Sequence, residues 1–173
     1  MSGNIDESTL TVRPMRRDDA PEVAAIYNQG IADRIATFET EPRTPADIES
    51  WFGRALAMVT VVDAAGRVVG YAVARPYADR CCYRGIGEFS VYVRRSERGR
   101  GVGRRALLGL VEASREAGLW KLLSRVFPEN SASLALMDSA GFRRVGVHEK
   151  HGKLDGVWKD TVIVEVLIPE NIH

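Results

Sequence analysis

Residues 88–110, reading EFSVYVRRSERGRGVGRRALLGL, decide the fold that we expect for this chain. The segment from Glu88 to Val93 is rich in β-branched and aromatic residues and holds no breaker, which is typical of a strand. The glycine turn R-G-R-G-V-G follows at 98–103, and from Val102 onward apolar residues recur at the spacing of one helix face. The stretch therefore predicts a strand, a tight turn and a helix in direct succession.

A helix that starts directly after a glycine turn leaves several backbone N–H groups without partners, all pointing the same way. The helix dipole adds partial positive charge at the same place. Full positive charges beside the turn come from Arg98, Arg100 and Arg104. Together these groups predict a site for a phosphate-bearing ligand. An ordinary tight turn with solvated arginines is the other interpretation of the same residues.

Two common phosphate motifs do not match. A nucleoside-triphosphate loop needs Gly-Lys followed by Ser or Thr, and the chain has no such triplet. A dinucleotide fingerprint needs G-x-G-x-x-G, but Arg104 stands at the third glycine position and Leu123 stands where an acid is expected. The remaining pattern is R-G-x-G-x-G directly after a V-Y-V strand.

The composition is that of an ordinary globular protein: 173 residues, 45% hydrophobic and 27% charged. We expect a flexible N-terminus over 1–9 and a single domain over 10–173. The net charge of +1 gives no reason to expect nucleic acid or a membrane surface as a partner. No apolar run is long enough to span a bilayer, and the adjacent Cys81 and Cys82 do not suit a disulfide framework. These features predict a cytoplasmic protein.

Periodicity and breakers predict seven strands and four helices in the order β-α-α-β-β-β-α-β-α-β-β. The expected strands cover residues 10–13, 59–63, 68–74, 88–93, 119–127, 142–148 and 157–167. The expected helices begin after a cap at Asp18 or Asp19, after Thr44, at Val102, and after a cap at Asn130 or Ser131. They end near residues 31, 56, 118 and 140. The run H-G-K-L-D-G is expected as the turn between the last two strands.

The R-G-x-G-x-G loop after V-Y-V resembles the acyl-CoA pyrophosphate loop, Q/R-x-x-G-x-G/A, of the GCN5-related N-acetyltransferase (GNAT) family. The predicted element order is similar to that family's topology as well. The resemblance implies an α/β (α+β) GNAT fold, with a mixed central sheet of about seven strands and helices on both faces. It also implies acetyl-CoA as the co-substrate and no metal.

Further stretches resemble one branch of the family, the N-acetyltransferases of phosphinothricin, methionine sulfoximine and arsinothricin. The matching runs are I-Y-N, T-F-E-T-E-P-R-T, R-P-Y with R-C-C-Y, E-F-S-V-Y-V, E-N-S-A-S, A-G-F and a final W-x-D. The closing run H-G-K-L-D-G-V-W-K-D looks closer to the arsinothricin members. This resemblance implies transfer of acetyl to the α-amine of a small glutamate-like amino acid by direct attack on the thioester, in a homodimer.

The resemblance also implies where the co-substrate binds. Pantetheine is expected beside the strand residues Val91, Tyr92 and Val93, using main-chain hydrogen bonds. The pyrophosphate is expected on the loop of Arg98, Gly99, Arg100, Gly101, Val102, Gly103 and Arg104. Asn130 and Ser139 are matched to contacts further along the co-substrate, although Asn130 suits a plain helix cap equally well.

Glu88 is the candidate catalytic base. An acid at the start of an otherwise apolar strand is costly to bury unless it is paired, and that cost is reasonable if the carboxylate faces a cleft and accepts a proton. The alternative is a structural ion pair with a loop arginine such as Arg80 or Arg84. The remaining candidates for substrate contact, besides Glu88, are Phe38, Arg75, Tyr77, Arg80, Tyr83, Ser90 and Lys153. The arginines and tyrosines of this loop could also form a solvated surface.

One position departs from the branch pattern. The branch commonly reads L-H-E-x-x-G-F, whereas this chain reads L-M-D-S-A-G-F, which places Met137 where a histidine is common. Methionine cannot carry a proton, so the acid that protonates the leaving thiolate is unassigned, and the position could serve packing instead. Two other functions remain open: a protein or peptide N-terminal acetyltransferase, and a non-catalytic acyl-CoA-binding domain.

Overall fold

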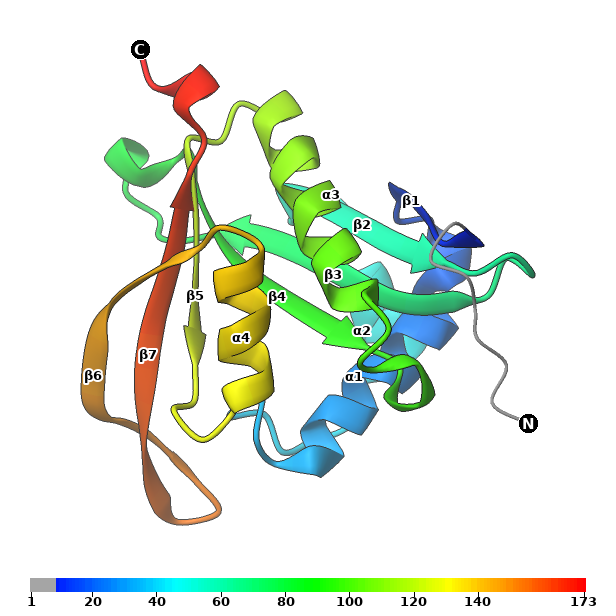
Figure 1. Ribbon diagram of the computed structural model, residues 1–173, viewed down its shortest axis with the longest axis horizontal. Helices are drawn as coiled ribbons and strands as arrows, with labels where there is room; N and C mark the ends of the chain where they lie inside the picture. Colours follow the sequence, from blue (N-terminus) through cyan, green and yellow to red (C-terminus); the bar gives the residue numbers. More distant parts are fainter. Residues whose placement is uncertain (1–8) are drawn as a thin grey trace.

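The computed structural model of this protein describes residues 9–173, so the expected flexible segment 1–9 lies, apart from Thr9, outside the described residues. One mixed sheet of seven strands has the order β1-β2-β3-β4-β5-β7-β6 (Figure 1). This confirms the predicted sheet. The strands are β1 (Thr11–Pro14), β2 (Ala57–Val62), β3 (Val68–Pro76), β4 (Ile86–Val93), β5 (Lys121–Val126), β6 (Arg143–Leu154) and β7 (Val157–Leu167).

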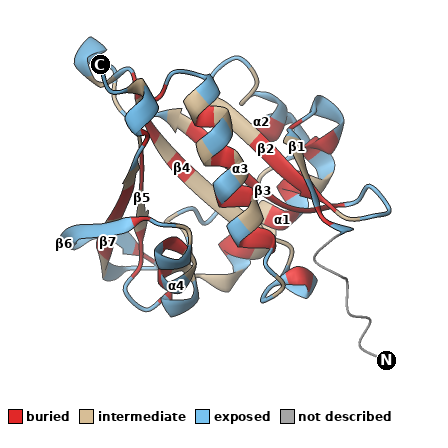
Figure 2. Cartoon of the chain, turned by 45° about the horizontal axis from the view of Figure 1, so that its top comes forward, coloured by how far each residue is buried: buried red, intermediate tan, exposed pale blue. Residues whose placement is uncertain are grey.

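Helices cover both faces of the sheet, as predicted. Helices α1 (Ala20–Asp33) and α2 (Pro45–Glu49) lie on one face, and α3 (Val102–Glu116) and α4 (Ser131–Ser139) lie on the other (Figure 1). Short 3-10 helices occur at Arg17–Asp19, Cys81–Tyr83, Arg95–Glu97 and Pro169–Asn171. Buried residues concentrate on the central strands and on the inward sides of the helices, whereas β6 is exposed along most of its length (Figure 2).

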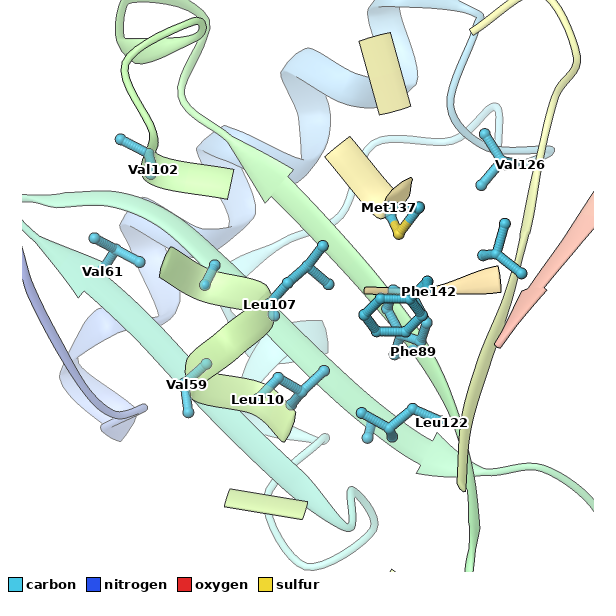
Figure 3. Close-up of a cluster of buried hydrophobic side chains, with 14 of the residues drawn as sticks. Val59, Val61, Phe89, Val102, Leu107, Leu110, Leu122, Val126, Met137 and Phe142 are labelled. Atoms are coloured by element: carbon cyan, nitrogen blue, oxygen red, sulfur yellow. The ribbon is translucent and has the colours of Figure 1, made fainter. Parts of the chain in front are cut away.

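Each face of the sheet has its own hydrophobic cluster, which explains why α3 and α1 have apolar stripes. Under α3 and α4, the fully buried Leu107 and Leu110 pack with Phe89 of β4 (Figure 3). On the opposite face, Ile26 of α1 packs with Tyr71 of β3. Burial of large apolar side chains on both faces of β3 and β4 fixes these strands as the rigid centre of the molecule.

Two predicted boundaries are wrong. The second helix was expected over 45–56 but ends at Glu49, and turns follow through Arg54. Its start is as expected, because Thr44 and Asp47 form a capping box. The helix cannot continue because Gly53 has a φ of +88°, outside the helical region. Trp51 lies in the turn after the helix and still packs against the hydrophobic cluster. The apolar spacing therefore indicated a buried side chain correctly, although the helix is short.

The turn between the last strands is also shorter than expected. Strand β6 continues through most of the run H-G-K-L-D-G, and only Asp155 and Gly156 form the turn, with φ of +48° and +79°. Both central residues of a tight hairpin turn need positive φ, and the pair Asp-Gly suits that geometry. The register between β6 and β7 shifts between His148 and Gly152, and Gly152 lies against the ring of Phe38.

The sheet splits between β4 and β5. These strands run parallel and pair over only three positions, from Ile86↔Lys121 to Glu88↔Leu123. Beyond Glu88, β4 stays with its antiparallel partner β3 as far as Val93, whereas β5 stays with β7 as far as Val126. Because each strand follows its own neighbour, the two diverge and leave a V-shaped gap in the sheet (Figure 1).

Candidate active site

A cleft of about 450 Å³ occupies the split in the sheet. One wall is the end of β4, the other is the end of β5, and the N-terminal end of α4 and the loop after α1 close it. Several predicted residues line this cleft: Phe38, Glu88, Ser90, Val91, Tyr92 and Asn130. Glu88 lies where the strands part, because it is the last residue of β4 that pairs with β5.

Glu88 forms an ion pair with Arg125 of β5. The sequence offered an ion pair with Arg80 or Arg84 as the alternative to a base role, and the partner is instead an arginine on the adjacent strand. Register explains the choice, since Arg125 is two residues past the Leu123 that pairs with Glu88. The side chains of Glu88 and Arg125 are 38% and 29% exposed, so the pair faces the open cleft rather than the core.

The main chain of β4 beyond Glu88 lacks a strand partner on the side that faces β5, within the described residues. This is the part of β4 that contains Val91, Tyr92 and Val93. Extended main chain with free N–H and C=O groups can accept an added strand-like ligand. The side chains there are fixed: Tyr92 packs between Tyr27 and Tyr71 at ring-centre distances of 5.0 and 5.7 Å. Burial raises the pKa of Tyr92 well above its ordinary value, so its phenol stays neutral.

The glycine turn lies between β4 and α3, as the sequence predicted. Gly99 and Gly101 have φ of +74° and +78°, which other residues adopt only with strain. No atom lies within 4 Å of a Cβ built on either glycine, so the turn is open on its outer side. Gly101 is the N-cap residue of α3 but has no side chain to cap the helix, which begins at Val102. An open turn in front of an uncapped helix start is the arrangement that binds phosphate groups.

The arginines of the turn have acidic or carbonyl partners. Arg98 pairs with Asp33 of α1 at 2.7 Å, Arg100 pairs with Glu97 at 2.9 Å, and the Nε of Arg104 donates to the carbonyl of Ser139 at 3.3 Å. Burial raises the pKa of Asp33, but hydrogen bonds from Arg95 and Arg98 outweigh burial and hold that pKa below its ordinary value. Asp33 therefore stays charged and anchors this side of the turn.

Asn130 caps α4, which was the alternative to a co-substrate contact, and it also lines the cleft. Its side-chain oxygen accepts from the backbone of Ser133 at 3.1 Å, and its amide donates to the carbonyl of Ile35 at 3.1 Å. Ser139 lies at the other end of α4, where its hydroxyl donates to the carbonyl of Leu136 at 2.8 Å. The hydrogen bond from Arg104 connects Ser139 to the glycine turn.

Of the predicted substrate residues, Phe38 and Ser90 join Glu88 in the cleft. The ring of Phe38 packs edge-on against Phe127 at 4.8 Å. Arg75 instead lines a second hollow of about 450 Å³, where its guanidinium lies 4.3 Å from the ring centre of Trp51.

The remaining predicted substrate residues lie apart from the cleft in this chain. Tyr77 and Tyr83 contact each other with ring centres 5.7 Å apart, and Arg80 lies over Tyr83 in the loop between β3 and β4. Lys153 lies over the ring of Trp158 at 4.7 Å on the β6–β7 hairpin. Neither group lines the cleft. Both cysteines of the β3–β4 loop are free and exposed.

Sequence reasoning missed Arg125 and His151 as residues of the cleft. Arg125 had a usable signal, because it is a charged residue in the apolar run L-L-S-R-V-F, and the same argument singled out Glu88. His151 had none, since it was placed in a turn. Met137 also lines the cleft, and only 2% of its surface is exposed.

Within residues 9–173, no group of three or more His, Cys, Asp or Glu side chains is arranged to hold a metal ion. In the same part of the chain, no helix has the length and apolar character that crossing a membrane requires.

Comparison with known proteins agrees with this geometry. A family model described as "Acetyltransferase (GNAT) domain" matches residues 9–143. A phosphinothricin N-acetyltransferase of Alcaligenes faecalis is 36% identical over 160 residues, which cover 90% of this chain and 81% of that protein. An L-methionine sulfoximine/L-methionine sulfone acetyltransferase of Pseudomonas aeruginosa is 32% identical, covering 91% of this chain and 94% of that protein.

Among solved structures, a GNAT superfamily phosphinothricin acetyltransferase from Sinorhizobium meliloti in complex with acetyl-CoA has the same fold. Its TM-score is 0.84 at 28% sequence identity, and the match covers 92% of this chain and 89% of that one. The split sheet, the glycine turn and the acid at the split thus occur in a chain whose similar proteins are named as acetyltransferases.

Proposed function

Because this chain belongs to the GNAT family and is an acetyl-CoA-dependent amino-acid N-acetyltransferase, we propose that its substrate is a small glutamate-like or glutamine-like amino acid. Phosphinothricin, methionine sulfoximine and arsinothricin are of this type, and acetylation of the α-amine would detoxify them. The observation that carries the proposal is the position of Glu88, at the point where β4 separates from β5 and beside the unpaired main chain of β4.

The glycine turn binds the pyrophosphate of acetyl-CoA in this proposal. Its outer face has room, since nothing lies near Gly99 and Gly101 there, and the adjacent residues include Arg98, Arg100 and Arg104. The N-terminus of α3 adds backbone N–H donors and the positive end of the helix dipole. From the turn, the free edge of β4 leads to Glu88 and would align the pantetheine arm. Asn130 and Ser139 lie at the two ends of α4, and both would contact the co-substrate further along.

Acetyl transfer to an amine needs a neutral nitrogen, although free α-amines are mostly protonated at pH 7. Glu88 accepts that proton, directly or through a water molecule. The amine nitrogen then attacks the thioester carbonyl carbon, and a C–N bond forms as the C–S bond breaks. A backbone N–H of the β4 edge stabilises the charge that develops on the carbonyl oxygen. The thiolate leaves with the electron pair, and the nitrogen loses its second proton as the amide forms. That proton goes to the thiolate, directly or through a water molecule, because Met137 cannot supply one.

Thiol release from acetyl-CoA tests the proposal. We expect the purified protein to release coenzyme A with L-phosphinothricin, L-methionine sulfoximine or arsinothricin, and to leave short peptides unmodified. Turnover with peptides alone would support a peptide N-terminal acetyltransferase. Coenzyme binding without turnover on either panel would support a non-catalytic acyl-CoA-binding domain. Both results would contradict the proposed function.

The proposal includes a homodimer in the cytoplasm. Strand β6 is an edge of the sheet, and large apolar residues are exposed on it and on its neighbour: Val145, Val147, Val157, Trp158 and Leu167. An exposed apolar patch of this kind supports a protein interface. Two exposed free thiols suit a reducing compartment. Light scattering should give twice the mass of one chain, and a monomer at micromolar concentration would contradict the dimer.

A further inference from the structure

Arg125 is a cleft residue without an assigned role. It belongs to β5 and reaches across the split to contact Glu88 of β4. Among the described residues that line the cleft, it is the only lysine or arginine. The cationic residues expected to bind the substrate, Arg75, Arg80 and Lys153, lie outside this lining. A substrate carboxylate that enters the cleft therefore meets one permanently charged cation, which is Arg125.

The guanidinium of Arg125 has donors to spare. It carries five N–H groups, and the hydrogen bond found for it within residues 9–173 runs from one Nη to an oxygen of Glu88. Its buried Nε has no partner in the same part of the chain. Arginine that is only partly satisfied is well suited to accept a second carboxylate, because its planar fork binds such groups in pairs. The 29% exposure of the side chain leaves it accessible from the cleft.

We propose that an α-amino acid binds by inserting into the Glu88–Arg125 ion pair, with its carboxylate on Arg125 and its ammonium group on Glu88. This inference rests on the proposed function and identifies how that site recognises its substrate. An amino acid zwitterion carries an ammonium group and a carboxylate group, and both are attached to the same α-carbon. Its insertion turns one ion pair into two, so neither Glu88 nor Arg125 is left without a partner.

A simple amine cannot make the same exchange. Its ammonium group can form an ion pair with Glu88, but Arg125 then has no partner inside a partly desolvated cleft. An unpaired charge in such a place is unfavourable. The ion pair thus selects α-amino acids over amines that lack the carboxylate. It also delivers the ammonium group to the carboxylate that removes its proton, so recognition and deprotonation are performed by the two halves of one ion pair.

The competing role for Arg125 is structural: it could neutralise Glu88 and tie β4 to β5. A structural role affects every acceptor equally, whereas the proposed role depends on the acceptor's carboxylate. L-Methionine sulfone and 3-(methylsulfonyl)propylamine form a matched pair of acceptors, since the second differs from the first only by the missing carboxylate. Their side chain is uncharged, so it does not compete for Arg125.

The test compares kcat/KM for both acceptors in the wild type, Arg125→Ala and Arg125→Lys. We expect Arg125→Ala to lose about 10- to 100-fold on the amino acid, mainly through KM, because one charge-assisted interaction is removed. On the amine, it should change by less than about threefold. Lysine keeps the charge but not the fork, so Arg125→Lys should recover part of the loss.

Arg115→Ala is the matched control, because Arg115 pairs with Glu112 on the exposed side of α3, outside the cleft. It should leave both acceptors unchanged. Melting temperature and acetyl-CoA affinity, measured for each variant, report on folding. An equal loss on both acceptors, or no loss on either, would overturn the inference while the proposed function stands. If the wild type acetylates neither L-methionine sulfone, L-methionine sulfoximine nor L-phosphinothricin, the proposed function fails and the inference fails with it.

Discussion

The glycine turn and the cleft are built in opposite ways. The turn is a run of consecutive residues, 98–103, whose shape follows from two glycines at positive φ and a helix start. The cleft is assembled from strands and loops far apart in the sequence, and its central ion pair joins Glu88 to Arg125, 37 positions later. The turn is therefore a local structure that carries its own geometry, whereas the cleft exists only once the sheet has formed and split.

Because of this difference, we expect the turn to bind the co-substrate and the cleft to carry out the reaction. Arg98 and Arg100 are paired with Asp33 and Glu97, and the open outer side of Gly99 and Gly101 leaves room for an anion without a change in the core. The cleft holds the carboxylate of Glu88 and the guanidinium of Arg125 in contact, and both are needed by the proposed reaction. Changes in the turn should then alter co-substrate affinity, and changes in the cleft should alter turnover and acceptor selectivity.

The largest expected effect is that of Glu88→Gln. Loss of the base should lower kcat by about 100-fold or more, while acetyl-CoA affinity measured by calorimetry stays the same, because the turn is untouched. Glu112→Gln, on the exposed side of α3, is the control. Unchanged turnover across the pH range would show that Glu88 is not the base. It would also contradict the assignment of the chemical step to the cleft.

A smaller effect, confined to the co-substrate, is expected for Gly101→Ala. Gly66 is a matched control, because its φ of +80° resembles the +78° of Gly101 and both have open space around a built Cβ. Each substitution should lower the free energy of unfolding by about 1 kcal/mol through backbone strain. Only Gly101→Ala should raise KM for acetyl-CoA, by about tenfold if one phosphate hydrogen bond is lost. Equal KM values in the two variants would show that the turn does not bind the co-substrate.

Substitution of Met137 tests whether this residue of the cleft wall serves packing alone. Its side chain lies with Phe89 and Phe142 in the buried cluster (Figure 3). Met137→Leu conserves volume, so we expect a loss of less than about 1.5 kcal/mol in the free energy of unfolding and an unchanged kcat. Denaturant unfolding and steady-state rates measure the two quantities. A drop in kcat without a loss of stability would assign Met137 a role in the reaction.

The smallest expected effect comes from Asp33, which pairs with Arg95 and Arg98 beside the turn. Its pKa in the folded protein lies below the usual 3.8, so its contribution to stability is present above that value and disappears as pH falls through the folded pKa. Asp33→Asn should therefore lower the free energy of unfolding by about 0.5 to 1 kcal/mol at pH 7. The difference from the wild type should shrink below about pH 4. A difference that stays constant down to pH 2 would contradict the ion pair as its cause.

The same contrast explains what the sequence could predict. Strand β4, the glycine turn and α3 are adjacent in sequence, and their hydrophobic period and glycines determine them locally. The length of α2 was not predictable in this way, because Trp51 and Phe52 keep a helical spacing although the helix ends at Glu49. The partner of Glu88 was not predictable either, since that choice depends on the register between β4 and β5. The positions of Arg80, Tyr83 and Lys153 relative to the cleft depend on tertiary structure in the same way.

A crystal structure with coenzyme A and N-acetyl-L-phosphinothricin tests the central claim most directly. We expect the pyrophosphate on the amides of residues 99–104, the pantetheine arm along β4, and the product amide nitrogen within hydrogen-bonding distance of Glu88. The product carboxylate should lie on Arg125, with the Glu88–Arg125 contact opened. Product bound in the second hollow beside Trp51, or an intact ion pair with both ligands present, would contradict the account.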